Sequence, residues 1–168
     1  MVIAGGGNAS DVTISTIQSI TIATKGNGIK FGDLTAARRP GSGGCSNSVR
    51  ALFAGGYVPG GLKFGNIDVL NIASGGNAVD SGNLSHQIYS PMGVASQTRA
   101  VFAGGQDDSS PGKINNIQYV NISTLGNTVH FGELTAIGRA GGSASDSHGG
   151  VRRFLRWQKY VLDMELIL

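Results

Sequence analysis

Short runs of hydrophobic residues alternate along most of the chain with polar stretches rich in glycine, serine and asparagine. One kind of run ends at two glycines and occurs three times, as VIAGGG (2–7), LFAGGY (52–57) and VFAGGQ (101–106). A second kind is rich in β-branched residues, as in TIQSITIAT (16–24), NIDVLNIAS (66–74) and NIQYVNIST (116–124). Its hydrophobic side chains occupy both odd and even positions, which predicts β-strands that are covered on both faces.

These runs recur at a fixed spacing, which shows an internal repeat. The Ala-Gly-Gly triplets lie at 4–6, 54–56 and 103–105, so their spacings are 50 and 49 residues. Two further blocks keep this register, with Gly-Asn at 26–27, 76–77 and 126–127, and FGDLT, SGNLS and FGELT beginning at 31, 81 and 131. The chain therefore divides into units at about 1–50, 51–99 and 100–150, which together form residues 1–151, followed by a divergent segment, 152–168.

Each unit is predicted to hold four antiparallel strands. The Gly-Asn pair favours a hairpin turn after the β-branched strand, because both residues tolerate positive φ. A strand of small residues precedes the next diglycine strand, at 43–50 and 93–99. Four strands in a period of about 50 residues, covered on both faces, are typical of a β-propeller blade. A β-solenoid repeats at about 20–30 residues, and a β-sandwich does not repeat its turns at a fixed interval.

The repeat resembles kelch repeats, and more specifically the glycine-rich kelch-like repeats of tail and virion proteins of marine bacteriophages. The matching residues are the run 45–48, Arg50, 53–56, 66–68 and 82–84. The resemblance covers residues 1–151 and departs from ordinary kelch repeats, because the spaced tyrosine and tryptophan after the diglycine are missing. It implies an all-β propeller and a virion protein; outside a phage, a cytoplasmic location is expected.

Composition and charge narrow the function further. Glycine supplies 28 of the 168 residues, yet no Gly-X-Y triplet runs through the chain, which excludes collagen. The net charge is +3, but residues 1–151 carry nine Lys/Arg against eight Asp/Glu. A nearly neutral repeat region without a basic stripe argues against nucleic acid as a partner. No secretory signal or membrane-spanning run is visible, so neither export nor a transmembrane segment is expected.

No catalytic, cofactor or metal site is expected from the sequence. The three histidines lie at non-equivalent positions, 86 in the second unit and 130 and 148 in the third, so no pair has ligand spacing. Cys45 is the only cysteine, which leaves no disulfide framework and no Tyr-Cys-His set of the copper-radical sugar oxidases. The run 145–148, Ser-Asp-Ser-His, matches the small-residue strand better than a hydrolase motif. GGGNAS precedes a strand rather than a helix, so it predicts no dinucleotide site.

Binding is expected at three loops that join the same two strands in each unit, 7–15, 57–65 and 106–115. Their sequences differ almost completely within an invariant frame, which favours a variable binding surface, although unconstrained drift is the alternative. The candidate residues are Asp11, Tyr57, Lys63, Phe64, Gln106, Asp107, Asp108 and Lys113. The adjacent carboxylates at 107–108 also suit calcium, but are more typical of a solvated loop tip.

These observations favour a non-enzymatic binding module for a receptor, a glycan or a neighbouring virion protein. Two alternatives stay open: a fragment of a larger propeller that acts as a cellular protein-interaction adaptor, and a sugar-active propeller enzyme. The enzyme predicts histidine or carboxylate groups that converge at the mouth of the propeller channel.

The final 17 residues, 152–168, contain no glycine and have a helical hydrophobic spacing. The stripe consists of Phe154, Trp157, Val161, Met164 and Leu168. An amphipathic helix is predicted, and three interpretations remain open. The helix docks on the propeller or on a partner, it lies on a membrane surface, or a change of reading frame replaced native repeats.

The two ends of the repeat region complement each other. The first unit begins with a diglycine strand that has no small-residue strand before it, whereas residues 142–149 form a small-residue strand with no diglycine strand after it. Three blades do not close a ring, since propellers need about four to eight. We therefore expect a head-to-tail dimer in which two chains of three units close a six-bladed ring, 2 × 3 = 6. A fragment of a longer propeller is the alternative.

Overall fold

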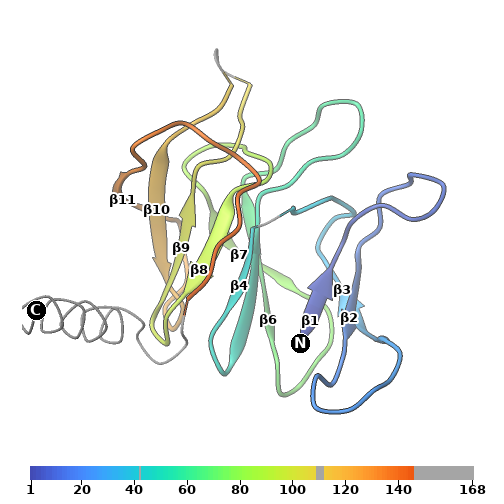
Figure 1. Cartoon of the computed structure of the whole chain (residues 1–168). Helices are drawn as coiled ribbons and strands as arrows, with labels where there is room; N and C mark the ends of the chain where they lie inside the picture. The colour runs from blue at the N-terminus through green and yellow to red at the C-terminus, as the bar shows by residue number, and fades with distance from the viewer. Residues whose placement is uncertain (42, 109–111, 146–168) are drawn as a thin grey trace, which may run out of the picture.

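A computed structural model describes residues 1–41, 43–108 and 112–145 of the chain. The described residues form three antiparallel sheets and no helix, which confirms the all-β prediction (Figure 1). The first sheet contains β1 (Val2–Ala4), β2 (Thr16–Ser19) and β3 (Ile29–Asp33). The second contains β4 (Gly44–Ser46), β5 (Arg50–Ala54), β6 (Asn66–Asn71) and β7 (Val79–Asn83). The third contains β8 (Met92–Ala95), β9 (Arg99–Ala103), β10 (Asn116–Asn121) and β11 (Val129–Glu133).

The strands of each sheet follow one another in chain order. The first sheet lacks the small-residue strand that begins the other two, as its sequence predicts. Each diglycine takes the same backbone conformation, with φ of +65° and +106° at Gly5 and Gly6 and +65° and +118° at Gly55 and Gly56. Residues that carry a side chain rarely adopt such positive φ angles, so this turn requires glycine at both positions.

Each sheet packs face to face against the next. The contact between the first and second sheets, here called the first joint, buries residues that include Ile17, Leu34, Ala51, Phe53 and Leu70. The contact between the second and third sheets, the second joint, buries residues that include Leu52, Ala54, Ile67, Val69 and Phe102. Alternate residues of β5 therefore enter opposite joints. In β6, Ile67 and Val69 enter the second joint and Leu70 enters the first, which confirms that this β-branched strand is covered on both faces.

The small-residue strands lie beside one another, which explains their composition. A Cβ on Gly93 of β8 would lie 3.0 Å from the carbonyl oxygen of Gly44 in β4. The row continues beyond β8, because Ser143 Oγ donates to Gly93 O and Ser145 Oγ donates to Ala95 O, both at 2.8 Å. Residues 142–145 nevertheless form no strand, so the predicted strand over 142–149 is wrong for this part. They bond to β8 through the hydroxyl groups of Ser143 and Ser145.

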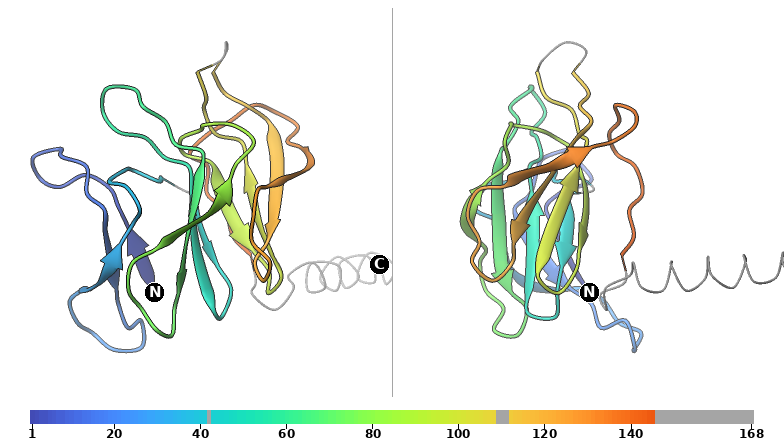
Figure 2. Two further views of the ribbon diagram at one scale, coloured as in Figure 1. Left: turned by 180° about the vertical axis from the view of Figure 1, so that it is seen from behind. Right: turned by 90° about the vertical axis from the view of Figure 1, so that its left-hand side faces the viewer.

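The predicted C-terminal helix, with Phe154, Trp157, Val161, Met164 and Leu168, lies outside the described residues. Within the described ranges, no helix is long and apolar enough to cross a membrane. The three long loops that follow the diglycines project from the same end of the sheets, which we call the loop end (Figures 1 and 2).

Candidate functional site

The loop end is held together by short backbone bridges. Within two of the long loops, Tyr57 pairs with Lys63 and Gln106 pairs with Lys113. Between consecutive units, Arg39 pairs with Tyr57 in the same antiparallel manner, and an equivalent bridge joins position 89 to Gln106. Loops of different sequence are therefore held by one repeated set of main-chain bonds. These bonds fix the backbone positions from which the loop side chains project.

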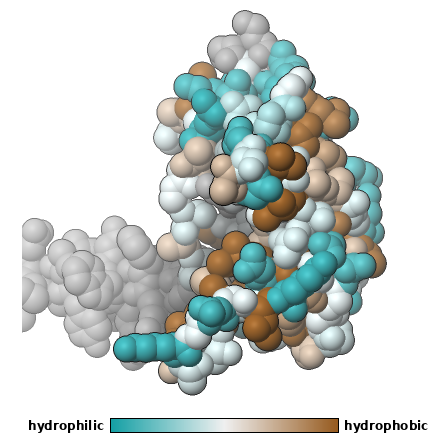
Figure 3. Space-filling model, turned by 90° about the vertical axis from the view of Figure 1, so that its right-hand side faces the viewer, coloured by the Kyte–Doolittle hydropathy of each residue, from teal (hydrophilic) through white to brown (hydrophobic). Residues whose placement is uncertain are grey.

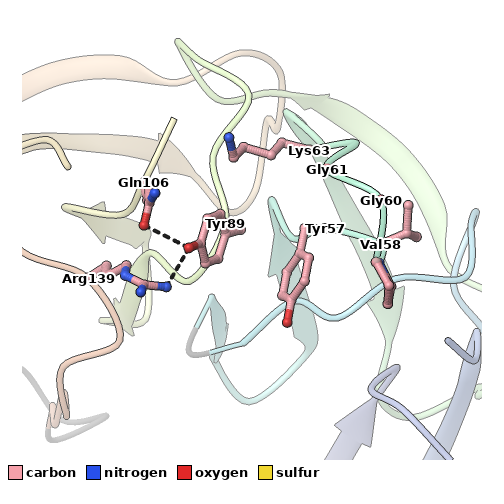
Figure 4. Close-up of a pocket in the computed structure, with 9 residues that line it drawn as sticks. Tyr57, Val58, Gly60, Gly61, Lys63, Tyr89, Gln106 and Arg139 are labelled. Atoms are coloured by element: carbon pink, nitrogen blue, oxygen red, sulfur yellow. Dashed lines mark hydrogen bonds between the residues drawn. The ribbon is translucent and has the colours of Figure 1, made fainter. Parts of the chain in front are cut away.

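Four side chains form a continuous row across this end, here called the aromatic row: Arg39, Tyr57, Tyr89 and Arg139. The Tyr57 and Tyr89 rings lie 4.9 Å apart, centroid to centroid. Arg39 lies 5.8 Å from the Tyr57 centroid, and Arg139 lies 5.0 Å from that of Tyr89, both measured from Cζ. Arg139 Nη1 donates to Tyr89 Oη (2.5 Å), and this hydroxyl donates to Gln106 Oε1 (2.7 Å) (Figure 4).

The aromatic row borders a pocket of about 330 Å³. Its lining residues are Tyr57, Val58, Pro59, Gly60, Gly61, Lys63, Tyr89, Gln106 and Arg139. Lys63 Nζ lies 5.7 Å from the Tyr89 ring centroid, so two cations, Lys63 and Arg139, lie near this ring. The pocket thus combines two aromatic faces, an amide and two cations.

The cations at this end differ in how their charge is balanced. Arg39 forms an ion pair with Asp11, and Lys63 forms one with Asp108. The hydrogen bond with Asp11 is the main reason that the pKa of Arg39 is raised above its ordinary value, with a further contribution from Tyr57. Arg139 is exposed and forms no ion pair within the described residues. It is therefore the guanidinium best placed to receive an anionic group.

The structure brings together some of the predicted binding residues and separates others. Tyr57, Lys63 and Gln106 line the pocket, whereas Asp11 and Asp108 balance cations beside it. Of the remaining predicted residues, Asp107 bonds through its N–H to Gly112 O, Lys113 is exposed, and the Phe64 ring lies against the Arg38 guanidinium.

Sequence reasoning missed Arg39, Tyr89 and Arg139, because all three precede the small-residue segments and lie outside the variable loops. One signal was available: these residues stand 50 positions apart, at 39, 89 and 139. They therefore occupy one structural position in consecutive units, and the packing of consecutive sheets places them in one row.

Cys45 lacks the features of a catalytic nucleophile. Its side chain packs against the hydrophobic residues of the second joint. Burial raises the pKa of the Cys45 thiol to about 12. The thiol is therefore protonated at neutral pH, and a protonated thiol is a poor nucleophile.

Two histidines belong to a small polar cluster on the second joint. Ser85 Oγ lies 2.9 Å from His86 Nδ1 and accepts from Asn116 Nδ2 at 3.1 Å. His130 Nδ1 lies 3.0 Å from Asn116 Oδ1. The bond between Ser85 and Asn116 has a counterpart in the first joint, where Asn66 Nδ2 donates to Thr35 Oγ1 (3.2 Å) without a histidine nearby. The cluster is thus part of the repeated packing between sheets.

In the described part of the chain, no group of three or more histidine, cysteine or acidic side chains is arranged to hold a metal ion. The sequence matches no protein-family model and no curated protein. The internal repeat and the geometry of the loop end are therefore the observations that bear on function.

Proposed function

We propose that the chain is a non-enzymatic binding module, built as three consecutive blades of a β-propeller, that binds acidic saccharides at its loop end. The observation that carries this proposal is the aromatic row, in which the exposed Arg139 guanidinium forms no ion pair with the described residues. Aromatic faces stack against the apolar faces of sugar rings, and a guanidinium binds carboxylate or sulfate groups through paired hydrogen bonds. The two features together match a sugar that carries a negative charge.

The chemistry of the pocket favours binding over catalysis. Its lining side chains in the described residues are aromatic, cationic, amide and small, whereas a glycoside hydrolase of the common type needs two carboxyl groups on either side of the scissile bond. The one carboxylate beside Lys63 is that of Asp108, which serves as its ion-pair partner.

The biological setting we propose is a bacteriophage tail or fibre. The glycine-rich repeats resemble those of phage tail and virion proteins. Variable loops on a repeated frame suit this task, because a receptor site can change there without disturbing the sheets. In this setting the ligand is a charged glycan of the host envelope.

Binding to immobilised acidic and neutral oligosaccharides, followed by calorimetry on the best ligand, tests the proposal. Tyr89→Ala removes the shared ring and is expected to weaken binding about tenfold or more. Tyr89→Phe keeps the ring and is expected to lose only a few-fold in affinity. Arg139→Gln is expected to abolish the preference for acidic over neutral sugars, whereas Lys30→Gln, which removes an exposed cation on β3, is the matched control with unchanged selectivity.

Two results contradict the proposal. One is equal binding of acidic and neutral sugars by the wild-type protein, since Arg139 then plays no part in recognition. The other is full affinity in a folded Tyr89→Ala variant, which places the ligand elsewhere.

A further inference from the structure

Among the residues that the structure describes, none covers the two end faces of the three-sheet arc. The leading face is the side of the first sheet that points away from the second, and the trailing face is the side of the third sheet that points away from the second. Ile3 on the leading face is 48% exposed, although its equivalents Phe53 and Phe102 are 7% and 0% exposed. Phe131 on the trailing face is 56% exposed. Hydrophobic residues lie among polar ones on the side formed by the first sheet (Figure 3).

Each joint inside the chain is sealed by main-chain bonds between a hairpin and a strand edge. In the first joint, Gly76 N–H donates to Phe31 O (2.9 Å) and Ala78 N–H donates to Asp33 O (2.8 Å). Asn77 Oδ1 accepts from Asp33 N–H at 3.0 Å. The hairpin of one sheet thus adds its backbone to the outer strand of the preceding sheet.

The second joint repeats these three bonds at positions 50 residues later. Gly126 N–H donates to Ser81 O (2.8 Å), and Thr128 N–H donates to Asn83 O (2.9 Å). Asn127 Oδ1 accepts from Asn83 N–H at 3.0 Å. Because the same three bonds recur at equivalent positions in both joints, this set of contacts defines how consecutive sheets dock.

Each end face carries one of the two partners of this set of bonds, either the hairpin or the strand edge. The hairpin 26–28, Gly-Asn-Gly, stands on the leading face at the position of 76–78 and 126–128. The strand edge 131–133 stands on the trailing face at the position of 31–33 and 81–83. Among the described residues, neither half forms this set of bonds. The chain therefore carries both halves of a third joint.

The glycine in the strand edge supports this complementarity. A Cβ on Gly32 would lie 1.8 Å from Gly76 O, and a Cβ on Gly82 would lie 2.2 Å from Gly126 O. Glycine is thus required in both joints because the hairpin passes directly over it. At Gly132 no atom of the described residues lies within 4 Å of such a Cβ, so no contact among these residues requires this glycine.

A polar contact beneath the hairpin repeats in the same way. Thr35 N–H donates to Asp68 Oδ2, and Ser85 N–H donates to Gln118 Oε1, both at 2.8 Å. The equivalent donor on the trailing face is Thr135, and the equivalent acceptor on the leading face is Gln18, and both residues are exposed. The leading face therefore offers the Gln18 amide oxygen as an acceptor, and the trailing face offers the Thr135 N–H as a donor.

We infer that the trailing face binds the leading face of a second copy of this chain, and that two copies close a two-fold ring through two such contacts. The hairpin 26–28 of one copy then bonds to the strand edge 131–133 of the other, and Gln18 accepts from Thr135. Residues 142–145, which follow the small-residue strands β4 and β8, then lie beside β1 of the second copy. Ser143 is directly opposite Ile3 of that copy, as Gly44 is opposite Phe53 within the second sheet. The occupant is a second copy because the matching surface is the chain's own, residue type for residue type.

The first test uses Gly132→Val in the full chain. The φ of Gly132 is one that residues with a side chain adopt, and no described atom lies near its Cβ position. The monomer of the variant is therefore expected to keep its circular dichroism spectrum and its unfolding midpoint. The added side chain occupies the path of the incoming hairpin, so self-association is expected to weaken at least tenfold. Ala37→Val adds bulk at an exposed position away from both end faces and is the matched control.

Analytical ultracentrifugation gives the outcome. A wild-type dimer, a monomeric Gly132→Val variant and a dimeric control support the inference. A wild-type monomer at micromolar concentration overturns it, and so does a Gly132→Val variant that stays dimeric. A wild-type ring of more than two copies overturns the two-fold closure.

The second test fixes the register. In a Cys45→Ser background, Ile3→Cys with Ser143→Cys is expected to form a disulfide between chains under mild oxidation, because directly opposed residues lie within disulfide range. Val12→Cys with Ser143→Cys is the control, since Val12 is similarly exposed at 57% but lies in the 7–15 loop. Absence of the cross-link in the first pair, or equal cross-linking in both, overturns the proposed pairing.

Discussion

The first and second joints share one frame but differ in the residue at its centre. In the first joint, Arg38 and Asp68 are both fully buried, and Arg38 Nη1 lies 3.2 Å from Asp68 Oδ2. In the second joint, the equivalent residues are Ile88 and Gln118, which are 0% and 1% exposed. A charged pair in one joint therefore stands where the other has a hydrophobic residue and an amide.

This difference shows which interactions both joints require and which belong to one joint alone. Both joints need an acceptor for the N–H of the residue at 35 or 85, and both a carboxylate and an amide supply it. The charge of Asp68 is needed only because Arg38 is buried above it, where its Nε also donates to Gly55 O (2.9 Å). The two positions are thus expected to change together.

The largest expected effect comes from breaking the charged pair. Arg38→Ala leaves the buried Asp68 carboxylate without its counter-charge, and this is expected to cost about 3–5 kcal/mol of unfolding free energy. Chemical denaturation monitored by circular dichroism measures the change, or shows directly that the variant does not fold.

The matched control transfers the second joint's residues into the first, as Arg38→Ile with Asp68→Gln. The double variant keeps the acceptor and removes both charges, so it is expected to recover most of the lost free energy, to within about 1–2 kcal/mol of wild type. A double variant as unstable as Arg38→Ala would show that the ion pair itself is required.

An intermediate effect is expected in the second joint from Gln118→Ala. This change leaves the Ser85 N–H and the Thr128 hydroxyl without their shared acceptor, at a cost of about 1–3 kcal/mol. Gln118→Glu is the comparison, because it keeps an acceptor but adds a charge with no buried arginine beside it. If the glutamate variant were the more stable of the two at neutral pH, the joints would not differ in their tolerance of charge.

The smallest expected effect on the unfolding free energy comes from Cys45, whose side chain packs against the second joint. Burial raises the pKa of its thiol from 9.0 to about 12, so the folded protein holds the proton more tightly than the unfolded chain. Stability from this group is complete below pH 9 and is lost as the pH rises toward 12. The wild-type unfolding free energy is expected to fall more steeply above pH 9 than that of Cys45→Ala, as measured by denaturation at pH 8–10.5. Parallel slopes for the two proteins would contradict the burial of this thiol.

The repeated elements of the fold were predictable because local patterns specify them. The diglycine turns, the two-faced strands and the small-residue strands each follow from residue types at fixed spacing, and the structure contains them. The candidate site was predicted in part: Tyr57, Lys63 and Gln106 lie at the pocket, but Tyr89 and Arg139 were missed. Both precede segments of small residues, and no local pattern marks them as neighbours of the variable loops.

The sequence by itself determined that this chain forms three repeated antiparallel sheets, because glycine pairs, hairpin residues and hydrophobic alternation act over a few neighbouring residues. Only the tertiary structure decided which distant side chains meet. Arg38 reaches Asp68, and the Tyr57 ring packs against the Tyr89 ring, because sheets that dock through the same main-chain bonds place these residues side by side. The same docking leaves one half of a joint on each end face, since contacts between sheets depend on three-dimensional register rather than on local sequence.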